Sequence, residues 1–317
     1  MDPTFQPAVF GKVLGRRLRT HRQTRGALRW YLLARNCGIL STGIRVMRGC
    51  LAALLIAIAG ATAASAQSRD LTGLGHVAFL VNDLSQSEMF YEKLGFQKAF
   101  EFTDTGKVTE AFVKINDRQF IELYPRTKDT QTAGLDHICF ETGDIASLRD
   151  AYLKQGLRPT ETKKMRAGNL LFGFHDPEGL WVEYVQYLPD SLHSLDRGKH
   201  LGNRVSQQLV KIVLIAPDPA ADLVFYTDKL GLEKDQNLPP SGLRLPGRSG
   251  DKLEIQRAGT NAKPRLVFYV EDVRRTAQEL RRRGFEVRKE GKDVSIDDPD
   301  SAIIVFTSEH SGAAGKP

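Results

Sequence analysis

Apolar and polar positions follow one pattern four times along the chain. Each time, an alternating apolar run ends at an Asp, and a stretch with apolar residues at every third or fourth position follows. A Gly then precedes further β-branched and aromatic runs. Residues 76–91 match 211–226 in this pattern, and residues 137–156 match 265–284. Alternation predicts half-buried strands, and the wider spacing predicts helices.

The repeated unit therefore has the order strand, helix and about three strands. Helices are expected at 85–94, 145–155, 219–229 and 273–283. Four βαβββ modules, combined in pairs, account for residues 74–188 and 207–308, which makes the chain an α+β protein with two domains of similar build. The polar segment 189–206 contains Gly, Ser and Pro and is expected to be a linker.

Charge is unevenly placed along the chain. Residues 1–66 hold ten Lys or Arg and one acid, which leaves 35 basic and 37 acidic residues in 67–317. This near-neutral body gives no electrostatic basis for nucleic-acid binding. Residues 47–66 combine a short positive start, an apolar run too short to span a bilayer and a small-residue cleavage motif, so they predict a signal peptide and export to the periplasm or the exterior. An uncleaved anchor is the alternative. Residues 1–46 fit neither role and are interpreted as a misassigned extension before a start at Met47.

Four segments resemble the vicinal-oxygen-chelate superfamily, which includes glyoxalase I, antibiotic-resistance proteins and extradiol dioxygenases. The segments are GHVAFLVNDLSQSEMFYEKLGF (75–96), FIELYP (120–125), GLDHICFETGDI (134–145) and FHDPEGLWVEYVQ (174–186). The resemblance covers nearly all of 74–308. It implies that each pair of modules forms an open β-cup that can hold one divalent metal ion.

The resemblance also implies the metal ligands, which are His76, Glu122, His137 and Glu183 in this chain. Both His–Glu spacings equal 46 residues, as a duplicated unit predicts. Glu122 lies in an apolar strand, where a carboxylate needs a metal or another partner. Arg118 or Arg126 could be that partner instead, and a lone His at a strand start is often structural. Two imidazoles and two carboxylates suit Zn²⁺, Ni²⁺, Mn²⁺ or Fe²⁺.

The second pair of modules offers a different set of residues at the matching positions. Alignment of the repeats places Lys211, Glu254, Arg265 and Val305 there. Protonated Lys and Arg donate no lone pair, so one exposed carboxylate is left and this cup is expected to hold no metal. One metal ion per chain follows. Lys211 and Arg265 are expected either on a solvated rim or on an anion. The first module must pair with the second, within one chain or across a homodimer.

The resemblance implies a small-molecule substrate with vicinal oxygens. Its first implied activity is a glyoxalase-type lyase or isomerase, in which the metal stabilises an enediolate or oxyanion and Glu122 or Glu183 is the catalytic base. An Fe²⁺ extradiol-type dioxygenase that uses His76, His137 and Glu183 is an alternative. A non-catalytic small-molecule binding or resistance protein is another.

Two further residues lie close to these motifs. His175 precedes the Asp-Pro turn at 176–177 and is a candidate substrate-binding residue, although turn residues at such a place are often only structural. Cys139 alternates with His137 and is expected to line the cup as a small filler. It is also the sole cysteine beyond residue 66, so no intrachain disulfide is expected in the body.

Overall fold

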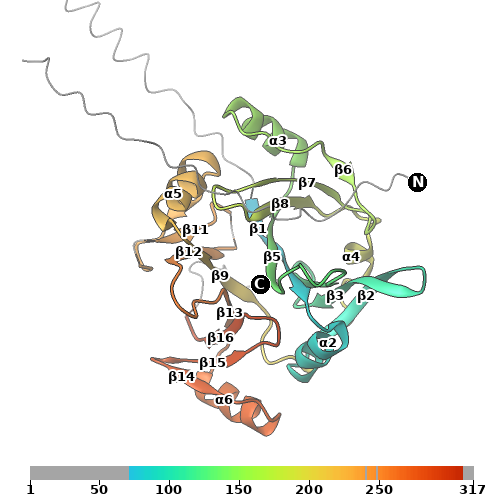
Figure 1. Cartoon of the computed structure of the whole chain (residues 1–317), viewed down its shortest axis with the longest axis vertical. Coiled ribbons are helices and arrows are strands. Elements are labelled where there is room, and N and C mark those ends of the chain that lie inside the picture. The colour runs from blue at the N-terminus through green and yellow to red at the C-terminus, as the bar shows by residue number, and fades with distance from the viewer. Residues whose placement is uncertain (1–70, 240, 248, 310–317) are drawn as a thin grey trace, which may run out of the picture. The chain divides into compact units, whose positions relative to one another are not determined.

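Each half of the described chain forms one eight-stranded sheet. Figure 1 shows how the strands and helices of both halves are arranged. The computed structural model describes residues 71–239, 241–247 and 249–309. The predicted signal peptide and the N-terminal extension lie outside these residues. Both sheets belong to one compact unit, Ser68–Pro317.

The two sheets have the same topology. The first has the order β2-β3-β4-β1-β5-β8-β7-β6, with strands β1 (Leu71–Val81), β2 (Gln97–Asp104), β3 (Lys107–Lys114), β4 (Phe120–Pro125), β5 (Gly134–Thr142), β6 (Lys163–Lys164), β7 (Leu170–His175) and β8 (Trp181–Gln186). The second has the order β10-β11-β12-β9-β13-β16-β15-β14, with strands β9 (Leu209–Ala216), β10 (Glu233–Lys234), β11 (Gly242–Arg244), β12 (Lys252–Arg257), β13 (Arg265–Tyr269), β14 (Arg288–Glu290), β15 (Asp293–Asp297) and β16 (Ile303–Thr307). The predicted α+β class and the paired βαβββ modules are confirmed.

The predicted helices are present with nearly the expected bounds. They are α2 (Leu84–Lys93), α3 (Ile145–Lys154), α5 (Pro219–Val224), which continues as a π-helical segment (Phe225–Lys229), and α6 (Val273–Arg282). The Asp of each repeat caps its helix by accepting a backbone N–H: Asp83, Asp144, Asp218 and Asp272. The Gly of each repeat follows the helix with φ between 77° and 87°, a region that favours glycine: Gly95, Gly156, Gly231 and Gly284.

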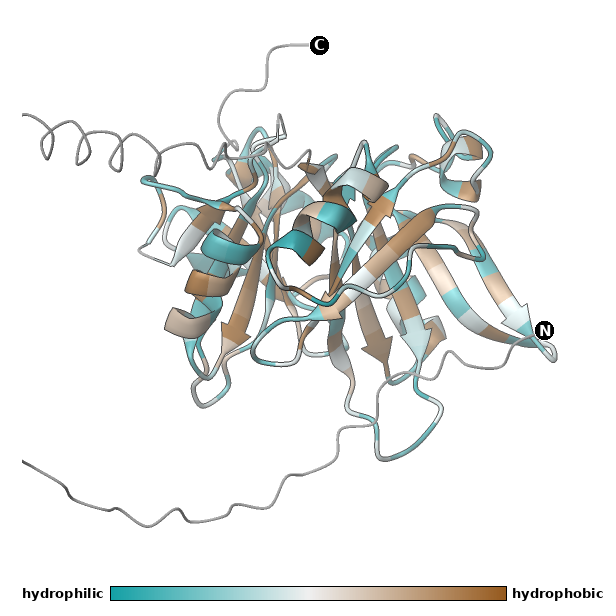
Figure 2. Ribbon diagram, turned by 90° about the horizontal axis from the view of Figure 1, so that it is seen from above, coloured by the Kyte–Doolittle hydropathy of each residue, from teal (hydrophilic) through white to brown (hydrophobic). Residues whose placement is uncertain are grey.

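The centre of the first sheet joins its two modules. β1 runs antiparallel to β5, and each of these strands runs parallel to the last strand of its own module, β4 or β8. The first module therefore pairs with the second inside one chain, as one of the two expected arrangements. Figure 2 shows that apolar residues are concentrated in the strands. No helix among the described residues is long and apolar enough to cross a membrane.

A reciprocal pair of hydrogen bonds is among the contacts between the two halves. Tyr91 in α2 donates to Asp298 Oδ2 of the second half at 3.2 Å. Tyr226, after α5, donates to Asp176 Oδ2 of the first half at 3.0 Å. In both Asp-Pro turns the other carboxylate oxygen accepts backbone N–H groups of the turn. In each turn, one carboxylate oxygen of the Asp therefore holds the turn together, and the other binds a Tyr of the other half.

The segment 189–206 is more than a connection between the sheets. It carries the short helix α4 (Leu192–Leu195), and His193 of that helix lies buried among Phe100, Phe112 and Phe120. The fully buried Lys114 binds Asp196 with Nζ–Oδ2 at 2.9 Å. Phe112 pairs with Glu122 across β3 and β4, so both side chains lie on the same face of the sheet. The segment thus packs on the face of the sheet that carries Glu122.

Candidate metal centre

Four adjacent strands bring the predicted ligands to one face of the first sheet. Ala78 of β1 lies opposite both Glu122 of β4 and His137 of β5. His76 lies opposite Cys139, and Cys139 lies opposite Glu183 of β8. Because alternate residues of a strand share a face, the register gathers the four side chains over the β4-β1-β5-β8 centre.

The two imidazoles and Glu183 contribute three donor atoms that face one another. Nε2 of His76 lies 3.2 Å from Nε2 of His137. Oε2 of Glu183 lies 3.4 Å from Nε2 of His76 and 3.6 Å from Nε2 of His137. Glu122 lies beside this group, with Oε1 at 3.3 Å from His76 Nδ1 and Oε2 at 3.8 Å from His137 Nε2. His76, Glu122 and His137 are 3–5% exposed, so the donors meet in a largely dehydrated place.

This donor set fits a divalent ion. Metal–ligand bonds of about 2.1 Å place neighbouring ligand atoms about 3.0 Å apart in an octahedron and about 3.4 Å apart in a tetrahedron. The separations of 3.2, 3.4 and 3.6 Å fall close to that range. Nδ1 of His76 faces Oε1 of Glu122 at 3.3 Å, so Nε2 is the ring nitrogen that faces the other two donors. A buried imidazole nitrogen that presents a lone pair to such a group is well suited to ligation.

Burial and neighbouring charges shift the pKa values of the candidate ligands. Burial disfavours the protonated ring of His137, but Glu183, Asp136 and Glu122 outweigh this and raise its pKa to about 9. Burial also opposes ionisation of Glu183, yet His137, His76 and Trp181 lower its pKa to about 2. Burial lowers the pKa of His76. Without a metal, the group therefore contains a His137–Glu183 ion pair beside a neutral His76.

Two neighbouring side chains hold candidate ligands in place. Asp136 Oδ2 lies 2.9 Å from His137 Nδ1, which leaves Nε2 of that ring toward the centre. Trp181 donates from Nε1 to Oε1 of Glu183 at 2.8 Å. Such contacts orient metal ligands and tune their basicity. Asp136 is adjacent in sequence to a candidate ligand, and Trp181 lies two residues from one, so both could have been proposed from the sequence.

Glu110 is a site residue that the sequence analysis did not identify. The Tyr124 hydroxyl lies 2.5 Å from Glu110 Oε1 and 3.0 Å from Glu122 Oε2. One phenolic proton serves only one of these contacts, so the other needs a proton on a carboxyl group. Burial raises the pKa of both Glu110 and Glu122, which fits this sharing of protons. Glu110 belongs to β3, and only the strand register brings it to the site.

The alternative partners considered for Glu122 are engaged elsewhere. Arg118 binds Glu141, and Arg126 binds Asn82. His175 is exposed; its Nδ1 lies 3.0 Å from the Gly179 carbonyl oxygen, and its ring contacts Trp181 at 4.8 Å between centroids. His175 therefore supports its own turn and has no direct contact with the four donors among its described interactions.

The second sheet repeats the register with other residues. Val213 lies opposite Glu254 and Arg265, as Ala78 lies opposite Glu122 and His137. The expectation of an exposed carboxylate was wrong, because Glu254 is 4% exposed and binds Lys211, with Nζ–Oε2 at 2.7 Å. Arg265 pairs with Glu290, and both of these side chains are 29% exposed. Both cations are thus neutralised within the second sheet.

Comparison with known proteins agrees with this architecture. Residues 73–184 match the family model described as the Glyoxalase/Bleomycin resistance protein/Dioxygenase superfamily. The Mn(II)-bound glyoxalase from Novosphingobium aromaticivorans is similar over 75% of this chain and 82% of its own, with 18% identity and a TM-score of 0.56. The 2,3-dioxygenase LapB from Pseudomonas sp. KL28 is similar over 76% and 94%, with 18% identity and a TM-score of 0.56.

A third solved structure is similar at the same level. Homoprotocatechuate 2,3-dioxygenase from Arthrobacter globiformis is 15% identical over 80% of this chain and 85% of its own, with a TM-score of 0.57. At such identities the likeness establishes the fold alone. A search of curated protein sequences gave no match.

Proposed function

We propose that the chain is a metal-dependent lyase or isomerase acting on a small molecule with adjacent oxygens, because residues 73–184 match the glyoxalase, bleomycin resistance protein and dioxygenase family model and bring the four candidate ligands together. The proposed metal ligands are His76, His137 and Glu183, with Glu122 as a fourth that can also act as a base. A divalent ion held there would polarise the substrate oxygens and stabilise the negative charge that develops on them. One ion per chain is proposed, and the Mn(II)-bound neighbour makes Mn²⁺ the first ion to test.

The position of Glu122 is the observation that supports proton transfer. Its carboxylate faces Nδ1 of His76 rather than the Nε2 that faces His137 and Glu183, so it can exchange a proton while the other three donors stay in place. Tyr124 contacts Oε2, and Oε1, which lies 3.3 Å from His76 Nδ1, is the oxygen proposed to accept a proton. Burial raises the pKa of this carboxyl group, which strengthens it as a base once it is ionised. Trp181 holds Glu183 in the role of a ligand.

The test compares Glu122→Gln with the wild-type chain loaded with Mn²⁺. Incorporation of solvent deuterium into α-hydroxyketones and hemithioacetals should be seen by NMR with the wild type. Loss of at least about 100-fold is expected in the variant, as for removal of a general base. Retained exchange at a full equivalent of bound metal would remove Glu122 from the mechanism.

An extradiol-type dioxygenase is the second candidate. His76, His137 and Glu183 form a group of two imidazoles and one carboxylate with separations of 3.2–3.6 Å, which is the donor set of that class. An Fe²⁺-loaded chain would then consume O₂ with catechols, and Glu122→Gln would keep that activity. Tight binding of such compounds without turnover would indicate the binding-protein alternative.

Export is part of the proposal and rests on residues 47–66. In a Gram-negative host, the chain should accumulate in the periplasm with a new N-terminus near Gln67. Recovery of the full-length chain from the cytosol as the main species would refute it.

A further inference from the structure

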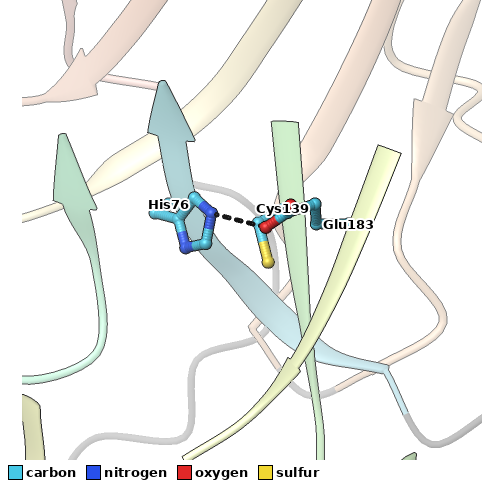
Figure 3. A group of neighbouring side chains, drawn as sticks. All are labelled: His76, Cys139 and Glu183. Atoms are coloured by element: carbon cyan, nitrogen blue, oxygen red, sulfur yellow. Dashed lines mark ion pairs between the residues drawn. The ribbon is translucent and has the colours of Figure 1, made fainter. Parts of the chain in front are cut away.

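Cys139 lies beside two residues of the candidate metal centre, His76 and Glu183, which Figure 3 draws with it. In the register of β5 it is the direct partner of His76 on one side and of Glu183 on the other. Its side chain is fully buried. The Sγ atom, one ring nitrogen of His76 and one carboxylate oxygen of Glu183 all lie within 4.8 Å of one another.

A second observation points to a ligand at the same place. His76 is 3% exposed, and its Nε2 lies 3.4 Å from Glu183 Oε2 and 3.2 Å from His137 Nε2, so three donor atoms face one another beside Cys139. His76 also forms a second group of potential metal donors with Glu122 and His137. Two sets of three donors therefore share one imidazole. One set contains only nitrogen and oxygen, and the other adds a sulfur.

We propose that the first cup has a second, thiophilic binding mode, in which His76, Cys139 and Glu183 bind a borderline or soft divalent ion such as Zn²⁺ or Cd²⁺. Thiolate sulfur favours these ions, whereas imidazole and carboxylate alone suit Mn²⁺ and Fe²⁺. On binding, the Sγ–H bond breaks, a metal–sulfur bond forms and the proton passes to the buffer. This inference goes beyond the proposed function, which uses no sulfur, although it shares His76 and Glu183 with it.

The second half of the chain supplies the matched control. Val267 lies opposite Lys211 and Val305, as Cys139 lies opposite His76 and Glu183. Val267 is 5% exposed, so the same fold accepts a valine at this position. Cys139→Val therefore removes the sulfur with a side chain that the equivalent site already accommodates. Cys139→Ser is a smaller second variant should the valine disturb packing.

The experiment titrates Cd²⁺ into the full chain and records the ultraviolet thiolate-to-metal charge-transfer band. Cys37→Ser and Cys50→Ser are present throughout, so that Cys139 is the sole thiol. One equivalent of Cd²⁺ should produce the band. Cys139→Val should abolish it, and His137→Ala should retain it. If equilibrium dialysis shows one bound Cd²⁺ but the band is absent, the inference is overturned. This comparison uses no Cys139 variant, so it does not depend on whether such a variant folds.

A parallel titration separates this inference from the proposed function. Affinities for Zn²⁺ and Mn²⁺ are measured by chelator competition and by Mn²⁺ paramagnetic resonance. Cys139→Val should weaken Zn²⁺ binding by about tenfold or more and change Mn²⁺ binding by less than about twofold. Equal losses for both ions would show that the sulfur is not a selective ligand. If the wild type forms the Cd²⁺ band but binds no Mn²⁺, the thiophilic mode stands and the Mn²⁺ form of the proposed function fails.

Discussion

Removal of the Tyr226 hydroxyl should destabilise the folded chain by about 2 kcal/mol. In Tyr226→Phe the ring stays in the core, where Tyr226 is fully buried, and a single oxygen is lost. That oxygen donates to Asp176 Oδ2 at 3.0 Å. Asp176 is 6% exposed, so water cannot readily replace the lost donor. The change therefore tests the contact between the two halves without creating a large cavity.

The magnitude follows from the kind of hydrogen bond. A hydrogen bond to a charged group contributes about 1.5–3 kcal/mol, and a neutral one contributes about 1 kcal/mol. Burial raises the pKa of Asp176, so its carboxyl group carries less than a full charge at a given pH. The expected loss of stability therefore lies between the values for a charged and a neutral hydrogen bond. Tyr91→Phe removes the equivalent contact to Asp298, which is longer at 3.2 Å, so its effect should be similar or smaller. The two contacts share no partner, and their effects should add to within about 0.5 kcal/mol.

Urea unfolding followed by tryptophan fluorescence measures the change. The midpoint should fall while the slope m stays constant, because the surface exposed on unfolding is the same. Tyr187→Phe is the matched control. The Tyr187 hydroxyl is buried but has no hydrogen-bond partner among the described residues, so its removal should cost less than about 0.5 kcal/mol.

Two results would refute this reasoning. If Tyr226→Phe and Tyr187→Phe have equal effects, the Tyr226–Asp176 hydrogen bond does not stabilise the fold. If the single variants already unfold in two separate transitions, the two halves do not unfold as one cooperative unit. No single free energy of unfolding then describes the effect of the substitution.

Three other predictions concern the metal centre and the second Asp-Pro turn. Trp181→Phe removes the donor to Glu183 Oε1 and should weaken Mn²⁺ affinity by about tenfold, measured by chelator competition. His76→Ala and His137→Ala should each lose the single bound Mn²⁺, and a full equivalent retained by both after dialysis would contradict the ligand assignment. Burial raises the pKa of Asp298 from 3.8 to about 6, so the folded state holds this proton more tightly than the unfolded state does. Its stabilising effect is present below pH 3.8 and is lost as pH rises through about 6. Between pH 4 and 7 the free energy of unfolding of the wild type should therefore fall by about 2 to 3 kcal/mol relative to that of Asp298→Asn. If urea unfolding gives the same pH dependence for both proteins, the raised pKa of Asp298 is wrong.

Much of the fold could be predicted because its determinants are local and repeated. Asp83 and Gly95 show the reason. The first caps a helix with its side chain, and the second follows that helix with φ of 87°, so each residue type is required by its own backbone. Recurrence of the same two residues in every module then makes the pattern visible without any alignment of homologues. The pairing of modules followed from chemistry, since other pairings leave His76 without partners.

Contacts across the sheets could not be predicted in the same way. Glu110 reaches Tyr124 only through the β3–β4 register, and irregular pairing between β2 and β3 makes register in this region hard to infer. His193 belongs to a polar segment expected to be a linker, yet the rings of Phe112 and Phe120 surround it. Such contacts join residues far apart in sequence. Their partners depend on how whole elements pack, which periodicity does not encode.

The shared register of the two sheets places a buried carboxylate at the same position in each. Glu122 and Glu254 occupy equivalent positions, and both are 4% exposed. A buried carboxylate needs a positive partner or a proton. In the second sheet Lys211 provides the positive charge from the very position that His76 holds in the first. A neutral imidazole at that position cannot do so, and burial lowers the pKa of His76 further. In the first sheet the nearest positive charge is the protonated ring of His137, 3.8 Å from Glu122 Oε2, and Glu183 shares it. One imidazolium thus stands between two carboxylates, and a divalent ion at the proposed centre would add positive charge where Lys211 supplies it in the second sheet.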